Sequence, residues 1–209
     1  MEEIVNYQLV LASASPRRRE ILSQAGLEYI VEPSEFDERG VRGGAPEEYV
    51  RALSRGKAEE VYRRLTRDRE KAEASGRPLL VLGADTVVAH GERLLNKPQD
   101  RADAAKMLAK LQGDCHEVYT GVALCRRGEN GEEELRSLAV KTEVHFYPVT
   151  QEEIERYLDC GEYADKAGAY AIQGRFAAYI REIRGDYYNV VGLPLSAVVQ
   201  ELKALGAWL

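Results

Sequence analysis

The chain has 209 residues, of which 44% are apolar and 31% are charged, a composition that is typical of a folded globular protein rather than a disordered one. The formal net charge of −6 argues against a protein that binds nucleic acid, because such proteins present a dominant positive field. No apolar run reaches the roughly 20 residues of a membrane span, and the acidic start is unlike a secretory signal, so we expect a cytoplasmic protein without membrane contact.

The first predicted elements are a strand, a tight loop and a helix. Gln8 to Ala12 is a short apolar run, and Ser13-Ala14-Ser15 follows it directly. Ser15 suits the N-cap of a helix, Pro16 suits its first position, and Gly26 suits its end. We therefore expect a helix that starts at Pro16.

A second helix is expected to begin near Pro46 and to run through Leu65. The charged stretch that follows, from Thr66 to Arg77, fits either a helix extension or a loop. A continuously apolar run, Leu79 to Leu82, then predicts a strand that is buried on both faces and ends before Gly83-Ala84-Asp85-Thr86.

Local signals predict the remaining elements. They are a helix capped by Asp100 and closed by Gly113, strands Val118 to Cys125 and Leu138 to Phe146 around an Asn130-Gly131 turn, a helix with a Thr150 and Glu153 capping box, a glycine-rich loop from Ala167 to Gly174, a strand from Phe176 to Ile183, and a last helix from Leu195 to Leu205. Mixed strands and helices with a hairpin predict an α/β or α+β fold on a central mixed sheet.

No two cysteines are close enough along the chain to form a CxxC pair, and the histidines are scattered without a metal-binding spacing. The cysteines are Cys115, Cys125 and Cys160, and the histidines are His90, His116 and His145. Their number and spacing predict neither a disulfide framework nor a zinc site. We therefore expect reduced thiols in the core.

Three consecutive arginines, Arg17 to Arg19, stand at the start of the first predicted helix. Backbone N–H groups are free there, and the helix dipole favours an anion and opposes cations. The arginines therefore indicate either an anion, such as a triphosphate, or a solvated basic turn.

Two charged residues lie next to predicted apolar segments. Lys57 shares a helix face with Leu53 and Val61, so it either reaches towards water or points into a pocket. Asp85 follows the predicted buried strand at its carboxyl end, where α/β proteins place ligands. It could bind a metal, act as the base for an attacking water, or cap the next turn.

Four loop residues are weaker candidates. Lys97, stiffened by Pro98, could meet a phosphate or be solvated, and Glu38 could join Asp85 around a magnesium ion or be a surface acid. Gln173 could read a base edge, whereas Tyr170 could stack on a base or pack in the core. Basic groups at a helix start, with carboxylates after a strand, indicate phosphate chemistry with a metal.

Seven blocks of the sequence, in register, resemble the Maf family over about residues 8 to 205. The blocks are residues 11–19, 82–88, 97–98, 120–122, 165–170, 172–174 and 189–194. The resemblance implies one domain, residues 1–209, with two lobes and a cleft between them. It also implies an elongated mixed sheet flanked by helices, similar to that of inosine triphosphate pyrophosphatases.

The resemblance also implies an activity. The protein would be a nucleoside triphosphate pyrophosphatase of the house-cleaning type, which cleaves a nucleoside triphosphate to the monophosphate and pyrophosphate. The segment from Ala171 to Gly174 resembles the subgroup acting on dTTP and UTP, although Ala171 and Arg175 depart from the commonest family pattern. Two alternatives remain open, namely a nucleotide-binding regulator of septum formation without turnover, and a pyrophosphatase for 7-methyl-GTP or purine nucleotides. Family members are often homodimers.

Roles follow from the resemblance by position. Asp85 would be the proton acceptor, and Glu38 and Asp85 would face the divalent ion, magnesium or manganese. The specificity positions would be Arg17, Thr86 and Gln173. Phosphate oxygens would be held by Arg18, Lys57 and Lys97, with help from Ser13.

Overall fold

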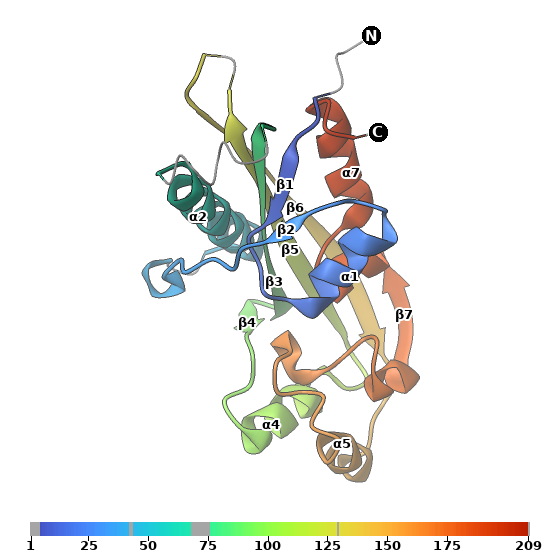
Figure 1. Ribbon diagram of the computed structural model, residues 1–209. Coiled ribbons are helices and arrows are strands. Elements are labelled where there is room, and N and C mark those ends of the chain that lie inside the picture. The colour runs from blue at the N-terminus through green and yellow to red at the C-terminus, as the bar shows by residue number, and fades with distance from the viewer. Residues whose placement is uncertain (1–4, 42–43, 68–75, 129, 209) are drawn as a thin grey trace. The chain divides into compact units, whose positions relative to one another are not determined.

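The computed structural model describes residues 5–41, 44–67, 76–128 and 130–208 (Figure 1). Its strands are β1 (Gln8–Leu11), β2 (Ile30–Val31), β3 (Leu79–His90), β4 (Arg93–Leu95), β5 (Cys115–Arg127), β6 (Glu133–Phe146) and β7 (Ile180–Arg184). Its helices are α1 (Pro16–Gln24), α2 (Pro46–Arg67), α4 (Arg101–Leu111), α5 (Gln151–Leu158), α6 (Tyr187–Val191) and α7 (Leu195–Ala204). Short 3-10 helices span Glu38–Gly40, Ala167–Ala169 and Arg175–Tyr179.

The strands form one seven-stranded mixed sheet, which confirms the predicted fold class. The order is β2-β1-β3-β5-β6-β7, with β4 paired to β3. β1 runs parallel to β2 and β3, whereas β4 is antiparallel to β3 and β7 is antiparallel to β6. No helix in the described part of the chain is both long and apolar enough to cross a membrane.

The chain divides into two compact units. The first unit comprises Met1–Asp85, Thr120–Ala139 and Gly192–Leu209, and the second comprises Thr86–Tyr119 and Val140–Val191. Strands β3, β5 and β6 therefore contribute residues to both units. One buried cluster in the first unit joins β1, α2, β3 and β5, and a cluster in the second unit is rich in aromatic side chains, including Phe146, Tyr170 and Phe176.

The locally encoded caps of α4 and α5 are confirmed. The Asp100 side chain accepts a hydrogen bond from the Asp103 N–H at 2.8 Å and caps α4. Thr150 and Glu153 form the predicted capping box of α5. Ser15 occupies the N-cap position of α1, but its side chain makes no capping bond. Part of the charged stretch after α2, residues 68–75, lies outside the described residues.

The prediction that a strand ends before Gly83 is wrong, because β3 continues through Asp85 to His90. Gly83 serves close packing rather than a turn. A Cβ atom built there would lie 2.4 Å from the Ser54 carbonyl oxygen and 2.7 Å from the Ala58 nitrogen, both on α2. Glycine thus lets the α2 backbone approach the strand directly.

The predicted strand from Phe176 to Ile183 is only partly correct. Residues Arg175–Tyr179 form a 3-10 helix, and β7 starts at Ile180. The Arg175 N–H donates to the Glu162 carboxylate at 2.8 Å and the Ala177 N–H to the Gly174 carbonyl at 3.1 Å, so the backbone turns here. This turn accompanies the burial of the Phe176 ring in the aromatic cluster.

Candidate active site

The loop between β1 and α1 ends beside β3. Leu11 pairs with Leu82 in the parallel ladder, and the Ala12 N–H donates to the Leu82 carbonyl at 2.8 Å. Because the two strands are parallel, the residues that follow each of them leave in the same direction. The start of α1 and Asp85 are therefore brought to the same region of the first unit.

Ser13, in this loop, and Arg18, on α1, are fixed by hydrogen bonds. The Ser13 Oγ accepts from the Ser15 N–H at 3.3 Å and from Arg18 Nη1 at 3.0 Å. Arg18 Nε donates to the Gly192 carbonyl at 2.8 Å. These bonds hold the Arg18 guanidinium at the start of α1 instead of leaving it to extend into solvent.

Close packing of α2 on the sheet positions Lys57. Besides Gly83 on β3, Gly121 on β5 admits the helix backbone, since a Cβ there would lie 2.2 Å from the Val50 carbonyl oxygen. Residues two apart on a strand point to the same face, so Asp85 faces α2 just as Gly83 does. Lys57, next to Ala58 on α2, therefore reaches Asp85.

The segment that carries Glu38 also packs on α2. A Cβ at Gly56 would lie 2.4 Å from the Phe36 ring, so only glycine admits this aromatic side chain against the helix. Glu38 follows two residues later and is thereby brought beside Lys57. Sequence spacing gave no sign of this contact.

Lys57 is the centre of the resulting charge cluster. Its Nζ lies 2.5 Å from Asp85 Oδ1 and 2.7 Å from Glu38 Oε1. The side chains of Lys57 and Asp85 are only 14% and 16% exposed, whereas that of Glu38 is 51% exposed. The Lys57 side chain therefore does not reach towards water but is directed at the two carboxylates.

The arginines belong to the same electrostatic environment. Burial lowers the pKa of Arg18, an effect that the negative charge of Asp85 opposes, while Arg17 lowers this pKa further and Glu38 raises it. The charge cluster thus comprises three cationic side chains, those of Arg17, Arg18 and Lys57, and two carboxylates, those of Glu38 and Asp85. This surplus of positive charge suits an anionic ligand.

Tyr49 is a neighbour of the cluster that the sequence analysis missed. It lies on α2, on the same helical face as Leu53 and Lys57 at spacings of four. Burial raises the pKa of Tyr49, and the charges of Asp85 and Glu38 raise it further. The spacing from Lys57 was the signal that could have identified this tyrosine.

Glu38 and Asp85 have the chemistry of a magnesium or manganese site. Both offer carboxylate oxygens, which these hard cations prefer, and one or two protein carboxylates are usual for magnesium. Both already converge on one cation, the Lys57 ammonium. The residues present therefore fit a divalent ion.

Three predicted site residues, Thr86, Lys97 and Gln173, belong to the second unit. Lys97 and Gln173 are exposed, and the Gly168 N–H donates to the Asn96 carbonyl at 3.2 Å. This bond ties the loop bearing Gln173 to the segment bearing Lys97. That Thr86, Lys97 and Gln173 share one site with the charge cluster stays a prediction.

Tyr170 packs in the core of the second unit. Its hydroxyl lies 2.9 Å from His116 Nε2, and its ring stands edge-on to the rings of His116 and Phe146. Burial lowers the pKa of His116 to about 3, so the imidazole is neutral at physiological pH. Of the two alternatives for Tyr170, packing is the one observed.

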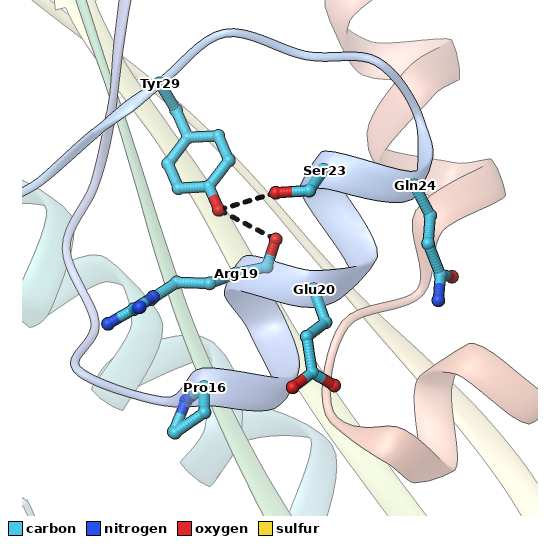
Figure 2. Close-up of a pocket in the computed structure, with 6 residues that line it drawn as sticks. All are labelled: Pro16, Arg19, Glu20, Ser23, Gln24 and Tyr29. Carbon is cyan, nitrogen blue, oxygen red and sulfur yellow. Dashed lines mark hydrogen bonds between the residues drawn. The ribbon is translucent and has the colours of Figure 1, made fainter.

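A surface hollow lies beside α1, and Glu38, Lys57 and Asp85 are not among the residues that line it. Figure 2 shows it lined by Pro16, Arg19, Glu20, Ser23, Gln24 and Tyr29. The Tyr29 hydroxyl donates to the Arg19 carbonyl at 2.8 Å and lies 2.9 Å from the Ser23 Oγ. Arg19 thus lines this hollow, whereas Arg17 and Arg18 do not.

Comparison with known proteins identifies relatives over almost the whole chain. The model of a family described as Maf-like protein matches residues 8–205. A dTTP/UTP pyrophosphatase of Agathobacter rectalis is 48% identical over 95% of this chain and 98% of its own. One of Symbiobacterium thermophilum is 47% identical over 95% of this chain and 94% of its own.

Among solved structures, a nucleoside-triphosphatase / dITP/XTP pyrophosphatase from Mycobacterium abscessus covers 96% of each chain, with 16% identity and a TM-score of 0.37.

Proposed function

The chain belongs to the Maf family, and we propose that it is a metal-dependent pyrophosphatase that hydrolyses dTTP and UTP to the monophosphate and pyrophosphate. The observation that carries this proposal is the convergence of Lys57, Asp85 and Glu38, with Arg18 within electrostatic reach. The names of the relatives, dTTP/UTP pyrophosphatase, support the choice of substrate.

The proposed metal ligands are Glu38 and Asp85. When bound, a magnesium or manganese ion would neutralise negative charge on the phosphate oxygens. Lys57 now bridges the two carboxylates, and we propose that its ammonium turns from them to a phosphate oxygen when nucleotide and metal bind. The lysine would thus compensate the carboxylates in the free protein and the triphosphate in the complex.

The arginines are proposed to bind the triphosphate. Arg17 and Arg18 stand at the start of α1, where backbone N–H groups also favour an anion. Arg18 is already held by Ser13 and Gly192, so little side-chain freedom is lost on binding. Fixed positive charge of this kind is the main contribution proteins make to phosphoryl-type reactions.

Asp85 is proposed to accept a proton from the attacking water. Its side chain is mostly buried, on the face of β3 that α2 covers, so its carboxylate is held rigidly. The oriented water attacks the α-phosphorus, the bond to the bridging oxygen breaks, and pyrophosphate leaves. The products are the nucleoside monophosphate and pyrophosphate.

The second unit is proposed to supply specificity. Gln173 carries both a donor and an acceptor and can match the edge of a pyrimidine base. Lys97 would hold a further phosphate oxygen, and Thr86, next to Asp85 in β3, would contribute to substrate choice. The anchored loop from Ala167 onwards gives Gln173 a defined attachment.

Replacing Gln173 by alanine should raise KM for dTTP and UTP by about two- to tenfold and change kcat less. One lost hydrogen bond is worth about 0.5–1.5 kcal/mol, and the base lies away from the reacting phosphorus. Steady-state kinetics of pyrophosphate release measure both constants. The matched control is Gln200→Ala on α7, an exposed glutamine outside the proposed site. An unchanged KM in Gln173→Ala would remove this residue from base recognition.

The activity itself is tested by pyrophosphate release from a panel of nucleotides with magnesium or manganese. We expect dTTP and UTP to be cleaved most efficiently. Faster cleavage of 7-methyl-GTP or of purine nucleotides would overturn the substrate assignment. Nucleotide binding without release of pyrophosphate from any member of the panel would favour a regulator.

A further inference from the structure

Three potential metal ligands meet on the sheet of the second unit, apart from the residues discussed above. They are Cys115 on β5, and Glu143 and His145 on β6. Cys115 Sγ lies 3.5 Å from His145 Nε2, which lies 3.7 Å from Glu143 Oε2. One ligand atom from each residue lies within 4.8 Å of the others.

The sheet creates this cluster from residues that are distant in sequence. Glu143 and His145 are two apart on β6, so their side chains share a face, and β5 is the neighbouring strand. The His145 side chain is 11% exposed and that of Glu143 is 34% exposed. The ligands are thus held by paired strands, with access for an ion from solvent.

The two separations that involve His145 match those of a zinc site, and the third, between Cys115 and Glu143, is within 4.8 Å. Zn–S bonds of about 2.3 Å and Zn–N or Zn–O bonds of about 2.1 Å give, at a tetrahedral angle, an S···N distance of about 3.6 Å and an N···O distance of about 3.4 Å. The observed distances of 3.5 Å and 3.7 Å are close to both. We propose that Cys115, Glu143 and His145 bind Zn²⁺, with water as the fourth ligand.

The donor set distinguishes this site from the Glu38 and Asp85 carboxylates. A thiolate and an imidazole select a borderline-soft ion such as zinc, whereas two carboxylates suit magnesium or manganese. Zinc replaces the thiol proton of Cys115, which is released to solvent. The neutral His145 ring binds through Nε2 and carries its proton on Nδ1.

The surrounding charges oppose the ion only in part. Lys141 Nζ lies 3.6 Å from Glu143, and Arg184 is the cross-strand partner of Glu143. Nearby carboxylates balance these cations: they are Asp114, Glu117 and Glu182. The main competitor is Arg181, whose Nη2 lies 3.4 Å from His145 Nδ1 and must withdraw when that nitrogen carries the proton. Arg181 is exposed, so it can turn into solvent at little cost.

Cobalt titration of the metal-free, reduced full chain tests the site, because a thiolate ligand to Co²⁺ produces an intense near-ultraviolet charge-transfer band. We expect this band to saturate at one equivalent and to disappear when zinc is added. Cys115→Ser should abolish it, and His145→Asn, which removes a direct ligand, should weaken zinc binding by more than the about 10–100-fold that the loss of an outer-shell partner costs. Cys160→Ser, the matched cysteine control, and Asp85→Asn should both keep the band.

Arg181→Ala provides a test in the opposite direction, since it removes the competitor for His145 and should tighten zinc binding. Circular dichroism of each variant verifies that it is folded. Absence of the thiolate band in the wild type, or its persistence in Cys115→Ser, overturns the proposal. Because the readout is spectroscopic, the result is independent of whether the chain hydrolyses dTTP.

Discussion

Replacing Asp85 by asparagine should lower kcat for dTTP by about 10²–10⁴-fold, the usual contribution of general-base catalysis. Asparagine has nearly the same shape, and its amide oxygen can still accept from Lys57, which now lies 2.5 Å from the carboxylate. The fold and the triphosphate contacts of the arginines should therefore persist. Pyrophosphate-release kinetics measure the loss at saturating metal, and nucleotide binding is measured separately.

The matched control for this variant is Asp159→Asn. Asp159 is 71% exposed and forms a surface ion pair with Arg101, so its charge contributes little to stability. We expect its kcat to equal that of the wild type. Full activity in Asp85→Asn would show that another group accepts the proton.

Replacing Lys57 by methionine should have two opposite effects. Turnover should fall by about 10²–10³-fold, as expected for the loss of one group that stabilises transition-state charge. Affinity for Mn²⁺ without nucleotide should rise by about tenfold or more, because the ammonium no longer competes for Glu38 and Asp85. Calorimetric titration with Mn²⁺ measures the second effect independently of activity.

Lys203→Met is the control for this charge change, since Lys203 is an exposed residue in the last turn of α7. We expect it to change neither turnover nor manganese affinity. If Lys57→Met binds Mn²⁺ no more tightly than the wild type, the lysine does not occupy the cation position.

Features with a local physical cause could be predicted from sequence. The Asp100 cap of α4 and the Thr150 and Glu153 box of α5 involve partners within three residues, so their signal is complete within a short segment. The strand, loop and helix around Ser13 are similarly local. The charge pattern at Arg17 to Arg19 is local as well, but its members differ in the structure: Arg18 lies within electrostatic reach of Asp85, whereas Arg19 lines the hollow beside α1.

Long-range packing could not be predicted in this way. Gly83 was interpreted as the end of a strand, although its role depends on Ser54 and Ala58 of α2, which lie far from it in sequence. Likewise, Glu38 approaches Lys57 because Phe36 packs on Gly56. Glycine in an apolar strand indicates a close approach as well as a turn, and sequence alone does not distinguish them.

Register in the sheet explains why the proposed zinc ligands meet although the sequence spacing predicted no zinc site. Cys115 and His145 are thirty residues apart, and their spacing has no zinc signature. They meet because β5 and β6 are neighbours and because the alternation along β6 places Glu143 and His145 on one face. A residue's partners across a sheet depend on register, which spacing along one strand does not supply.

The central claim, that one charge cluster binds both the metal and the triphosphate, is tested most directly by a crystal structure with Mn²⁺ and a non-hydrolysable dTTP analogue. The account predicts an anomalous manganese peak within bonding distance of Glu38 and Asp85. It also predicts phosphate oxygens within hydrogen-bond distance of Arg18 and Lys57. A triphosphate bound elsewhere, with Lys57 still bridging the two carboxylates, would contradict it.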